Sequence, residues 1–364
     1  MKLVLKKDKF LEGLQTVQNL ISTRTTLPVL SNCLIKTISG KISLASTDLD
    51  TGIRTEVEAD VEKGGAISLP ARRLFSIVRE LPSEELTLEA DSKLNATIRA
   101  GNAFFRIKGL AEEEFPPFPK AQSAHVFKTD QKTLKDMFRK TTYAMSTDES
   151  RYVLNGAFLS FKDNKLTVVS TDGRRLALVE QPLEFPKTSE LEVILPTKAV
   201  NELQRLLADE GEVTIGVDEN QITFNLGSIF LVSKLIEGKY PNYRQVIPNE
   251  TKERVTIERE LLLGAVHRVA LLSSDKSSSV RLSFGKNNLD ITANTPEIGE
   301  AKESMAINYK GKEFSIAFNP DYLSDPLKSL DSDEIFLDFT DELSPCVMRY
   351  QKPFLYVIMP MRQA

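Results

Sequence analysis

The chain repeats itself with a period of about 124 residues, and this repetition constrains its fold more than any other feature. The run Gly40–Asp48 (GKISLASTD) returns as Asn164–Asp172 (NKLTVVSTD), and a weaker copy lies at Asn287–Thr295 (NNLDITANT). Each copy is a turn followed by an alternating apolar run, which is typical of a hairpin strand. Because a fixed period is the mark of a duplicated structural unit, the 364 residues are predicted to form three domains of one kind.

Two further markers keep the same period. A short strand runs into a proline and then into an amphipathic helix at Pro70, Pro196 and Pro320, and proline suits the first turn of a helix. Apolar residues at helical spacing also predict a helix near the start of each repeat, over 7–21, 131–145 and 258–272. Each repeat therefore reads as strand, helix and strands, followed by the same pattern again.

This pattern predicts an α+β fold of three similar domains, each with mainly antiparallel sheet and two helices. Proline-rich or polar stretches at 115–119 and 248–251 mark the boundaries, which places the domains at 1–120, 121–249 and 250–364. Like units in line close into a ring if the rotation between them fits, and two chains would supply six units. A head-to-tail ring-shaped homodimer is one interpretation, and a three-domain monomer built by duplication is the other.

The charge distribution gives a first indication of a partner. The net charge is −4, yet the six predicted helices together carry about +5, which leaves about −9 for the rest. A basic helical face within an acidic shell suits a polyanion that is held without reading its sequence. Solvated helix faces often carry Lys and Arg for no such reason, and the third repeat adds nothing to the sum.

The sequence lacks the common signatures of catalysis and metal binding. It has no phosphate-cradling G-x-x-x-x-G-K-[ST], no H-E-x-x-H and no G-x-S-x-G, so we expect neither an enzyme nor a bound cofactor. Two cysteines, Cys33 and Cys346, and two histidines are too few for a disulfide framework or a zinc or other metal site. A hydrolase that uses Asp48 or Asp172 is a remote alternative, since both are better explained as turn residues that bond backbone N–H groups.

No export signal or run of about 18 apolar residues is present, so a cytoplasmic protein without a membrane partner is expected.

Four strings in order then carry a resemblance to a known family. They are Arg151–Gly156 (RYVLNG), Thr171–Ala177 (TDGRRLA), Tyr240–Pro248 (YPNYRQVIP) and Tyr356–Arg362 (YVIMPMR), and Thr26–Asn32 (TLPVLSN) agrees with them. Together they resemble the bacterial DNA polymerase III beta subunit, the sliding clamp, over essentially the whole chain.

The resemblance implies a head-to-tail dimeric ring of six similar domains, the DNA clamp fold, with helices lining a central hole. It implies no catalysis: a clamp encircles duplex DNA independently of sequence and tethers the replicative DNA polymerase, so that the enzyme stays at high effective concentration near its template. The implied partners are duplex DNA, a second copy of the chain, the polymerase III catalytic subunit, an ATP-driven clamp loader and other proteins with a clamp-binding motif.

The resemblance also implies a shared peptide-binding pocket, in which extended peptides with a Gln followed by Leu and Phe would dock. Carried over by motif, the pocket residues are Leu154, Thr171, Gly173, Arg174, Arg175, Leu176, Pro241, Gln245, Val246, Asn319, Tyr322, Val357, Met359, Pro360, Met361 and Arg362. Arg174 stands where the family often has His, and Gln245 stands where Arg is common. Both departures lie at the pocket and bear on peptide preference.

Two further sets of residues complete the expectation. DNA contacts are expected from Arg24, which matches a loop of the family, and from basic residues on the predicted helices, namely Arg72, Arg73, Arg79, Lys132, Lys135, Arg139 and Lys198. The dimer interface is expected to join the edge strand of domain 1 to domain 3, through Phe104, Phe105 and Ile107 on one side and Leu271, Leu272 and Glu303 on the other.

Two features stay open in the sequence. Pro326 lies inside the last predicted helix and should kink or shorten it. A repeat-built scaffold that binds proteins but does not encircle DNA is the alternative function.

Overall fold

The structure, a computed structural model, describes residues 1–21, 27–118, 123–273, 279–351 and 353–361. The chain divides into two compact bodies, one made of Met1–Lys135 with Asn201–Leu235 and the other of Asp136–Val200 with Ile236–Ala364. The division passes through the second predicted domain, so each body contains part of that domain together with one flanking domain. Each body is described by itself below.

The first body holds two antiparallel sheets. Its five-stranded sheet has the order β5 (Asp60–Lys63), β1 (Lys2–Lys6), β7 (Glu85–Ala90), β8 (Asn95–Ala100) and β9 (Ala103–Lys108). Its eight-stranded sheet has the order β10 (His125–Asp130), β15 (Glu212–Val217), β16 (Gln221–Asn225), β17 (Ile229–Lys234), β4 (Thr51–Glu58), β3 (Lys41–Thr47), β2 (Asn32–Ile38) and β6 (Ala66–Pro70). The larger sheet joins four strands of the first repeat to four of the second through the β4–β17 ladder.

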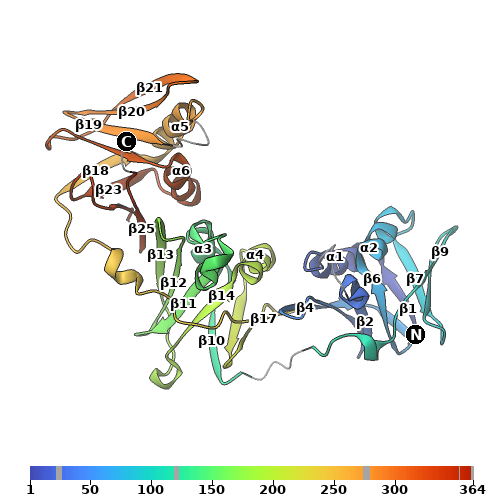
Figure 1. Ribbon diagram of the computed structural model, residues 1–364. Coiled ribbons are helices and arrows are strands. Elements are labelled where there is room, and N and C mark those ends of the chain that lie inside the picture. The colour runs from blue at the N-terminus through green and yellow to red at the C-terminus, as the bar shows by residue number, and fades with distance from the viewer. Residues whose placement is uncertain (22–26, 119–122, 274–278, 352, 362–364) are drawn as a thin grey trace. The chain divides into compact units, whose positions relative to one another are not determined.

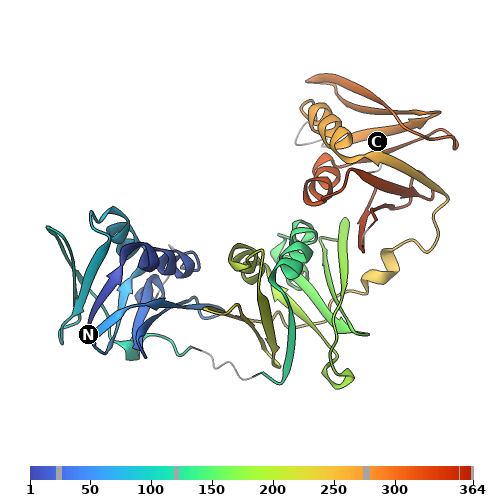
Figure 2. The ribbon, with the colours of Figure 1, turned by 180° about the vertical axis from the view of Figure 1, so that it is seen from behind.

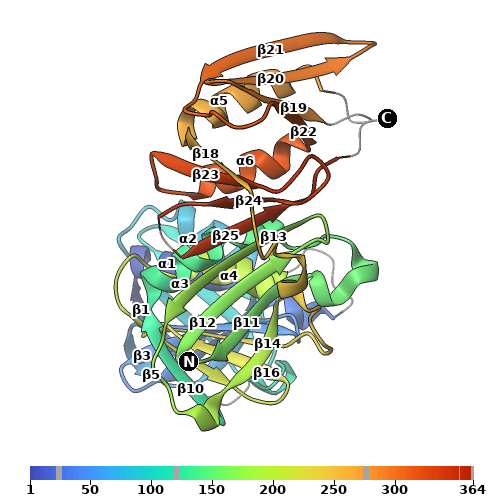
Figure 3. The same ribbon diagram turned by 90° about the vertical axis from the view of Figure 1, so that its left-hand side faces the viewer.

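The second body is built to the same plan. Its eight-stranded sheet has the order β14 (Leu191–Pro196), β11 (Gly156–Lys162), β12 (Lys165–Thr171), β13 (Arg175–Pro182), β25 (Phe354–Ile358), β24 (Cys346–Arg349), β23 (Glu334–Phe339) and β18 (Glu253–Glu258). A four-stranded sheet follows, in the order β21 (Gly299–Ala306), β20 (Asn288–Thr295), β19 (Val280–Gly285) and β22 (Phe314–Phe318). Here the β13–β25 ladder, visible in Figure 3, joins the second repeat to the third.

Each body packs a pair of helices against its sheets. In the first body these are α1 (Lys7–Gln18) and α2 (Ala71–Glu80), and in the second they are α5 (Arg259–Ala270) and α6 (Pro320–Ser329), as Figures 1 and 2 show. The apolar residues at helical spacing are the buried ones, for example Phe10, Leu14 and Val17 on α1. The remaining helices, α3 (Gln131–Arg139) and α4 (Thr197–Leu206), span the division between the bodies. The predicted α+β class with antiparallel sheets is confirmed.

The predicted helix over 131–145 is shorter than expected, since α3 ends at Arg139. The cause is local, because the hydroxyl of Thr141 donates to the Met137 carbonyl at 2.8 Å and the backbone N–H of Thr141 turns to Phe138. A threonine that bonds nearby backbone groups competes with continuation of a helix. Met145, counted on the helical face, therefore lies beyond the helix.

Pro326 does not shorten α6, which has ten residues like α2 and α4. A proline inside a helix removes the N–H that would bond the carbonyl four residues earlier, here that of Tyr322. The hydroxyl of Tyr356 on β25 donates to that carbonyl at 2.8 Å. A side chain from the neighbouring sheet thus satisfies the acceptor that Pro326 leaves without a partner.

Candidate binding site at the junction of β13 and β25

A tight turn between β12 and β13 forms one edge of the candidate site. The hydroxyl of Thr171 accepts from the N–H of Gly173 at 3.1 Å and donates to the Arg175 carbonyl at 2.6 Å. One carboxylate oxygen of Asp172 accepts from the N–H groups of Arg174 and Arg175, at 2.9 and 3.0 Å. Gly173 has φ +85°, which favours glycine. The Thr-Asp-Gly string thus forms a turn that is stabilised by its own Thr171 and Asp172 side chains.

The first repeat contains the same turn with other side chains. Asp48 accepts from the N–H groups of Asp50 and Thr51 at 3.0 and 2.7 Å, and Thr47 bonds the N–H of Leu49 and the carbonyl of Thr51 at 3.0 and 2.9 Å. The equivalent of Gly173 is Leu49, at φ +80°. Asp48 and Asp172 are therefore turn-forming residues in separate turns, as expected from the sequence, and not a catalytic pair.

Beside this first copy of the turn, the side chain of Phe118 occupies the space next to Gly52. Gly52 takes the place of Leu176, and a Cβ on Gly52 would lie only 2.8 Å from the Phe118 ring, which therefore sits directly on the glycine. Asp50, in the place of Arg174, pairs with Lys234 at 2.9 Å. Arg54 stacks between the rings of Phe118 and Phe230, at 5.5 and 5.2 Å from their centroids.

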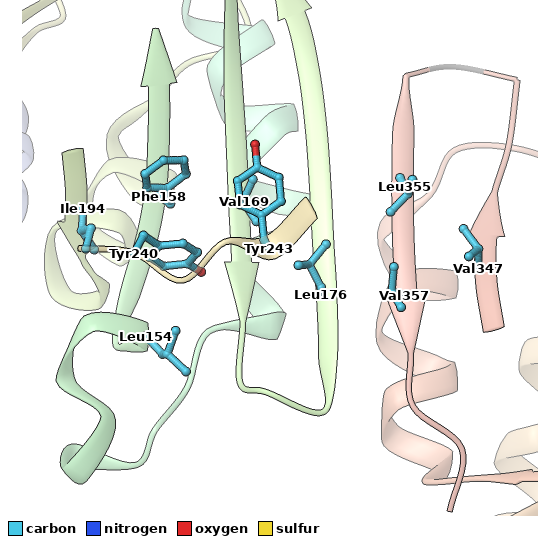
Figure 4. Close-up of a cluster of buried hydrophobic side chains, with 10 residues drawn as sticks. All are labelled: Leu154, Phe158, Val169, Leu176, Ile194, Tyr240, Tyr243, Val347, Leu355 and Val357. Atoms are coloured by element: carbon cyan, nitrogen blue, oxygen red, sulfur yellow. The ribbon is translucent and has the colours of Figure 1, made fainter. Parts of the chain in front are cut away.

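In the second body, a cluster of buried apolar side chains lies behind the turn. Phe158 on β11 stacks on Tyr240 at 4.8 Å between ring centroids and meets Tyr243 at 5.9 Å (Figure 4). The other members come from both sides of the β13–β25 ladder, namely Leu154, Val169, Leu176, Ile194, Val347, Leu355 and Val357. Leu176 and Val357 are direct partners in that ladder. The cluster thus fixes the junction of the second and third repeats as one packed unit.

Arg175 lies inside the site rather than on its surface. Its side chain is only 11% exposed and bonds the Asp172 carboxylate at 3.0 Å, the Asp325 carboxylate at 2.5 Å and the Tyr143 carbonyl at 2.5 Å. Its guanidinium also lies 4.4 Å from the centroid of the Tyr322 ring. Burial alone would lower the pKa of Arg175, but the hydrogen bond that it donates to Asp325 and the nearby charges outweigh this effect, so the pKa is raised and the group stays charged.

The N-terminal part of helix α6 forms the other edge of the candidate site, opposite the turn between β12 and β13. Asn319 caps its N-terminus, since the side-chain oxygen accepts from the N–H of Asp321 at 2.9 Å. The segment after β25 runs between the two edges: the N–H of Met359 donates to the Arg174 carbonyl at 3.0 Å, and that of Met361 donates to the Ala317 carbonyl at 2.7 Å. Both methionine side chains remain about two-fifths exposed, at 42% and 39%.

The structure therefore brings together the residues predicted for a peptide pocket. Those with exposed side chains or surfaces are Gly173, Arg174, Pro241, Gln245, Val246, Met359 and Met361, while Asn319, Tyr322, Thr171 and Pro360 are half-buried. Leu154, Leu176 and Val357 are buried beneath them. Arg362 lies outside the described residues. Exposed apolar side chains over a packed floor, with a few polar groups beside them, suit the docking of an extended peptide.

Sequence reasoning did not assign the aromatic residues Phe158, Tyr240 and Tyr243, or the acidic residue Asp325, to the site. A signal for the tyrosines was present, because Tyr240-Pro-Asn-Tyr243 repeats the pattern of Phe115-Pro-Pro-Phe118 between the first two repeats. No comparable pattern marks Asp325, whose importance comes only from its contact with Arg175.

Comparison with known proteins identifies the family. Three family models match in order: the DNA polymerase III beta subunit N-terminal domain over residues 1–119, the central domain over 128–242 and the C-terminal domain over 244–362. The chain belongs to the DNA polymerase III beta subunit family.

Relatives of this family match along most or all of their length. The chain is 36% identical to the beta sliding clamp of Chlamydia muridarum over 362 residues, which covers 100% of this chain and 99% of the relative. It is 33% identical to the beta sliding clamp of Synechococcus elongatus, again with 100% and 99% covered. Among solved structures, the sliding clamp of Bartonella birtlesii bound to griselimycin has a TM-score of 0.96 at 35% identity, and that of Bacillus subtilis has 0.96 at 30%, with both chains fully covered in each case.

The basic residues that the beta subunit resemblance assigns to DNA differ in how freely they are available. Arg73 and Lys132 are exposed on α2 and α3, and within the described part of the chain neither has an ion-pair partner. Arg72 donates to the Ile21 carbonyl at 3.0 Å, and Lys198 is exposed on α4. The others are paired with carboxylates: Arg79 with Glu80 at 3.0 Å, Lys135 with Asp209 at 2.9 Å, and Arg139 with Asp136 and Asp331. Arg24 lies outside the described residues.

The residues that the resemblance assigns to a beta subunit dimer lie on two edge strands and at the end of α5. Phe104 and Phe105 are exposed on β9, the edge strand of the five-stranded sheet, and Ile107 is half-buried there. Arg99 and Arg106 lie 5.0 and 5.6 Å from the centroid of the Phe104 ring.

In the second body, β21 is the edge strand of the four-stranded sheet, and its Glu303 pairs with Arg268 at 2.5 Å. Leu271, at the end of α5, is 70% exposed, and Leu272 beside it is half-buried. An exposed edge with aromatic side chains tends to pair with another strand.

Within the described ranges, no group of three or more His, Cys, Asp and Glu side chains is placed to hold a metal ion. Among the same residues, no helix has the length and apolar character needed to span a membrane.

Proposed function

We propose that this chain is a DNA sliding clamp, a non-catalytic processivity factor of DNA polymerase III. In this role it encircles duplex DNA as a head-to-tail homodimeric ring lined by helices and tethers the polymerase and other replication proteins. The observation that carries the proposal is the match of three successive beta subunit domains, in order, along the whole chain, together with full-length relatives that are beta sliding clamps. We assign the domains to 1–120, 121–249 and 250–364, and place the protein in the cytoplasm.

The site at the β13–β25 junction is the proposed docking place for partner peptides. The exposed side chains of Met359, Met361 and Val246 supply adaptable apolar contact. Arg174 extends from the turn into solvent and forms no ion pair with the described residues, so the rim carries a free positive charge. A peptide with an acidic residue beside its apolar anchors fits this rim better than a basic one.

The proposed DNA contacts are the basic residues on α2, α3 and α4, with Arg73 and Lys132 the most available. Contacts to phosphates position a protein on DNA without reading its sequence, which a sliding ring requires. The proposed dimer contact joins the β9 edge of one chain to the region of Leu271, Leu272 and Glu303 of another. Such a contact covers the apolar edge that each chain otherwise exposes.

Two measurements test the function. Small-angle X-ray scattering over a dilution series should give a particle of twice the 40.8 kDa chain mass, with a pair-distance distribution that requires a central hole. The protein, once loaded by its clamp loader and ATP, should stay on circular duplex DNA and leave when the circle is cut. A monomer at micromolar concentration, with no difference in retention between circular and linear DNA, would instead favour a scaffold that does not encircle DNA.

A further inference from the structure

We propose that Asp325 is a positioning residue of the peptide site: through Arg175 it holds the first half of α6, including Tyr322 and Asn319, against the turn at 171–175. The inference rests on the proposed peptide-binding function. Asp325 is not one of the residues assigned to the pocket, and its proposed effect passes through Arg175 to Tyr322 and Asn319.

The duplicated turn shows what Arg175 is not needed for. In the first repeat, Thr51 stands in the place of Arg175, and the turn still makes the same four hydrogen bonds around Thr47 and Asp48. The turn at 171–175 therefore requires only the backbone of Arg175 and the side chains of Thr171 and Asp172. The guanidinium must serve another purpose.

That purpose is the link to α6. The guanidinium spans from Asp172 on the turn to Asp325 on the helix, and it lies against the face of the Tyr322 ring at 4.4 Å. The side chains of Arg175, Asp172 and Asp325 are 11%, 17% and 28% exposed, so the pairs are largely shielded from solvent. Charge-assisted hydrogen bonds of this kind are stronger than exposed ion pairs, and removing one partner leaves the other charge buried without compensation.

Tyr322 also forms a hydrogen bond with the eight-stranded sheet, in addition to its contact with Arg175. The Tyr356 hydroxyl donates to the Tyr322 carbonyl, the same carbonyl that Pro326 leaves without a helical partner. The ring of Tyr322 is thus fixed by β13 through Arg175, and its backbone is fixed by β25 through Tyr356. Losing Asp325 removes the ion pair that ties Arg175 to α6, which loosens the packing of the Tyr322 ring against the guanidinium, while the turn and the β13–β25 ladder keep their own bonds.

The site then has two parts whose contributions to peptide affinity should respond differently to the loss of Asp325. Val246, together with the turn and the ladder, forms a part that does not depend on Asp325. Asn319, Tyr322 and Met361 form a part that does. A peptide that contacts both parts should lose affinity when Asp325 is changed, and the loss should come from the α6 part alone.

A double-mutant cycle separates these parts. The probe is a fluorescein-labelled peptide with Gln, Leu and Phe, and its affinity for the full-length protein is measured by fluorescence anisotropy. We expect Asp325→Asn to weaken binding about 10-fold, in line with the loss of one charge-assisted hydrogen bond. In a Tyr322→Ala background the same change should cost less than about 2-fold, whereas in a Val246→Ala background it should again cost about 10-fold. Asp321→Asn is the matched control, because it lies on the same helix, is exposed and forms no ion pair with the described residues.

Hydrogen exchange supplies a second readout that does not depend on the peptide. In Asp325→Asn, the amides of α6 should exchange faster, while those of Arg174 and Arg175, which Asp172 holds, should be unchanged. Equal loss of affinity in all three backgrounds, or unchanged exchange in α6, would overturn the inference. Absence of peptide binding by the unaltered protein would instead contradict the proposed peptide site, so the two failures are distinguishable.

Discussion

The two exposed methionines provide a quantitative test of the peptide site. Fully burying a methionine side chain contributes about 1.5–3 kcal/mol. Because Met359 and Met361 are 42% and 39% exposed, a peptide that covers them can still gain about two-fifths of this at each residue, or about 0.6–1.2 kcal/mol. Replacing both by Ala should therefore cost about 1.2–2.4 kcal/mol, which weakens binding by about 8- to 60-fold.

The assay is a fluorescence anisotropy titration of a labelled Gln-Leu-Phe peptide, with sedimentation of each variant to report the mass of the assembly. The mass should not change, because neither methionine belongs to the predicted dimer contact. Leu343→Ala is the control, since Leu343 is 80% exposed in the loop between β23 and β24 and lies outside the site. The reasoning is refuted if the double variant binds within about twofold of the unaltered protein, or if Leu343→Ala weakens binding as much.

Three further predictions follow from the other described features. Replacing Arg73 and Lys132 together by Ala should reduce the slope of log affinity for duplex DNA against log salt by about 1.8, since each lost phosphate contact removes about 0.9; an unchanged slope would exclude them from the DNA face. Phe104→Asp should shift the sedimenting species towards the 40.8 kDa monomer at micromolar concentration, and an undiminished dimer would place the interface elsewhere. Burial raises the pKa of the Cys33 thiol from 9.0 to about 12, so the free energy of unfolding should fall as pH rises from 9 towards 12, by up to about 1.4 kcal/mol per pH unit. Urea titrations of Cys33→Ala should show a shallower fall with pH, and an equally steep fall would mean that Cys33 is not the group responsible.

The sequence was informative about the fold because its signals were local and repeated. The strands at 41–47 and 165–171 and the helices after Pro70 and Pro196 were predictable from alternation, spacing and proline placement, and the threefold period supported each of them. The repeat also allowed Asp48 and Asp172 to be recognised as turn residues. Where a helix end depends on one side chain, as at Thr141, spacing alone placed the end too late.

The interior of the site was less predictable, for a physical reason. Arg175 could be assigned to the site by resemblance, but nothing in its neighbourhood in the sequence indicates that it is buried and bonded to a residue 150 positions away. Nor does the pattern around Pro326 indicate that Tyr356 would bond the carbonyl it frees. Such contacts depend on which strands become neighbours, and the joining of one repeat to the next through β13 and β25 is a property of the assembled sheet.

The glycine at position 52 bears on how many partners one chain can hold. The turn beside it repeats the turn at 171–175, but the Phe118 ring lies on Gly52, and Asp50, which pairs with Lys234, stands in the place of Arg174. If the site at the β13–β25 junction binds peptides as proposed, its equivalent in the first repeat lacks the same space beside the turn. Each chain is then expected to bind one partner peptide at a time, and the proposed dimer to bind two.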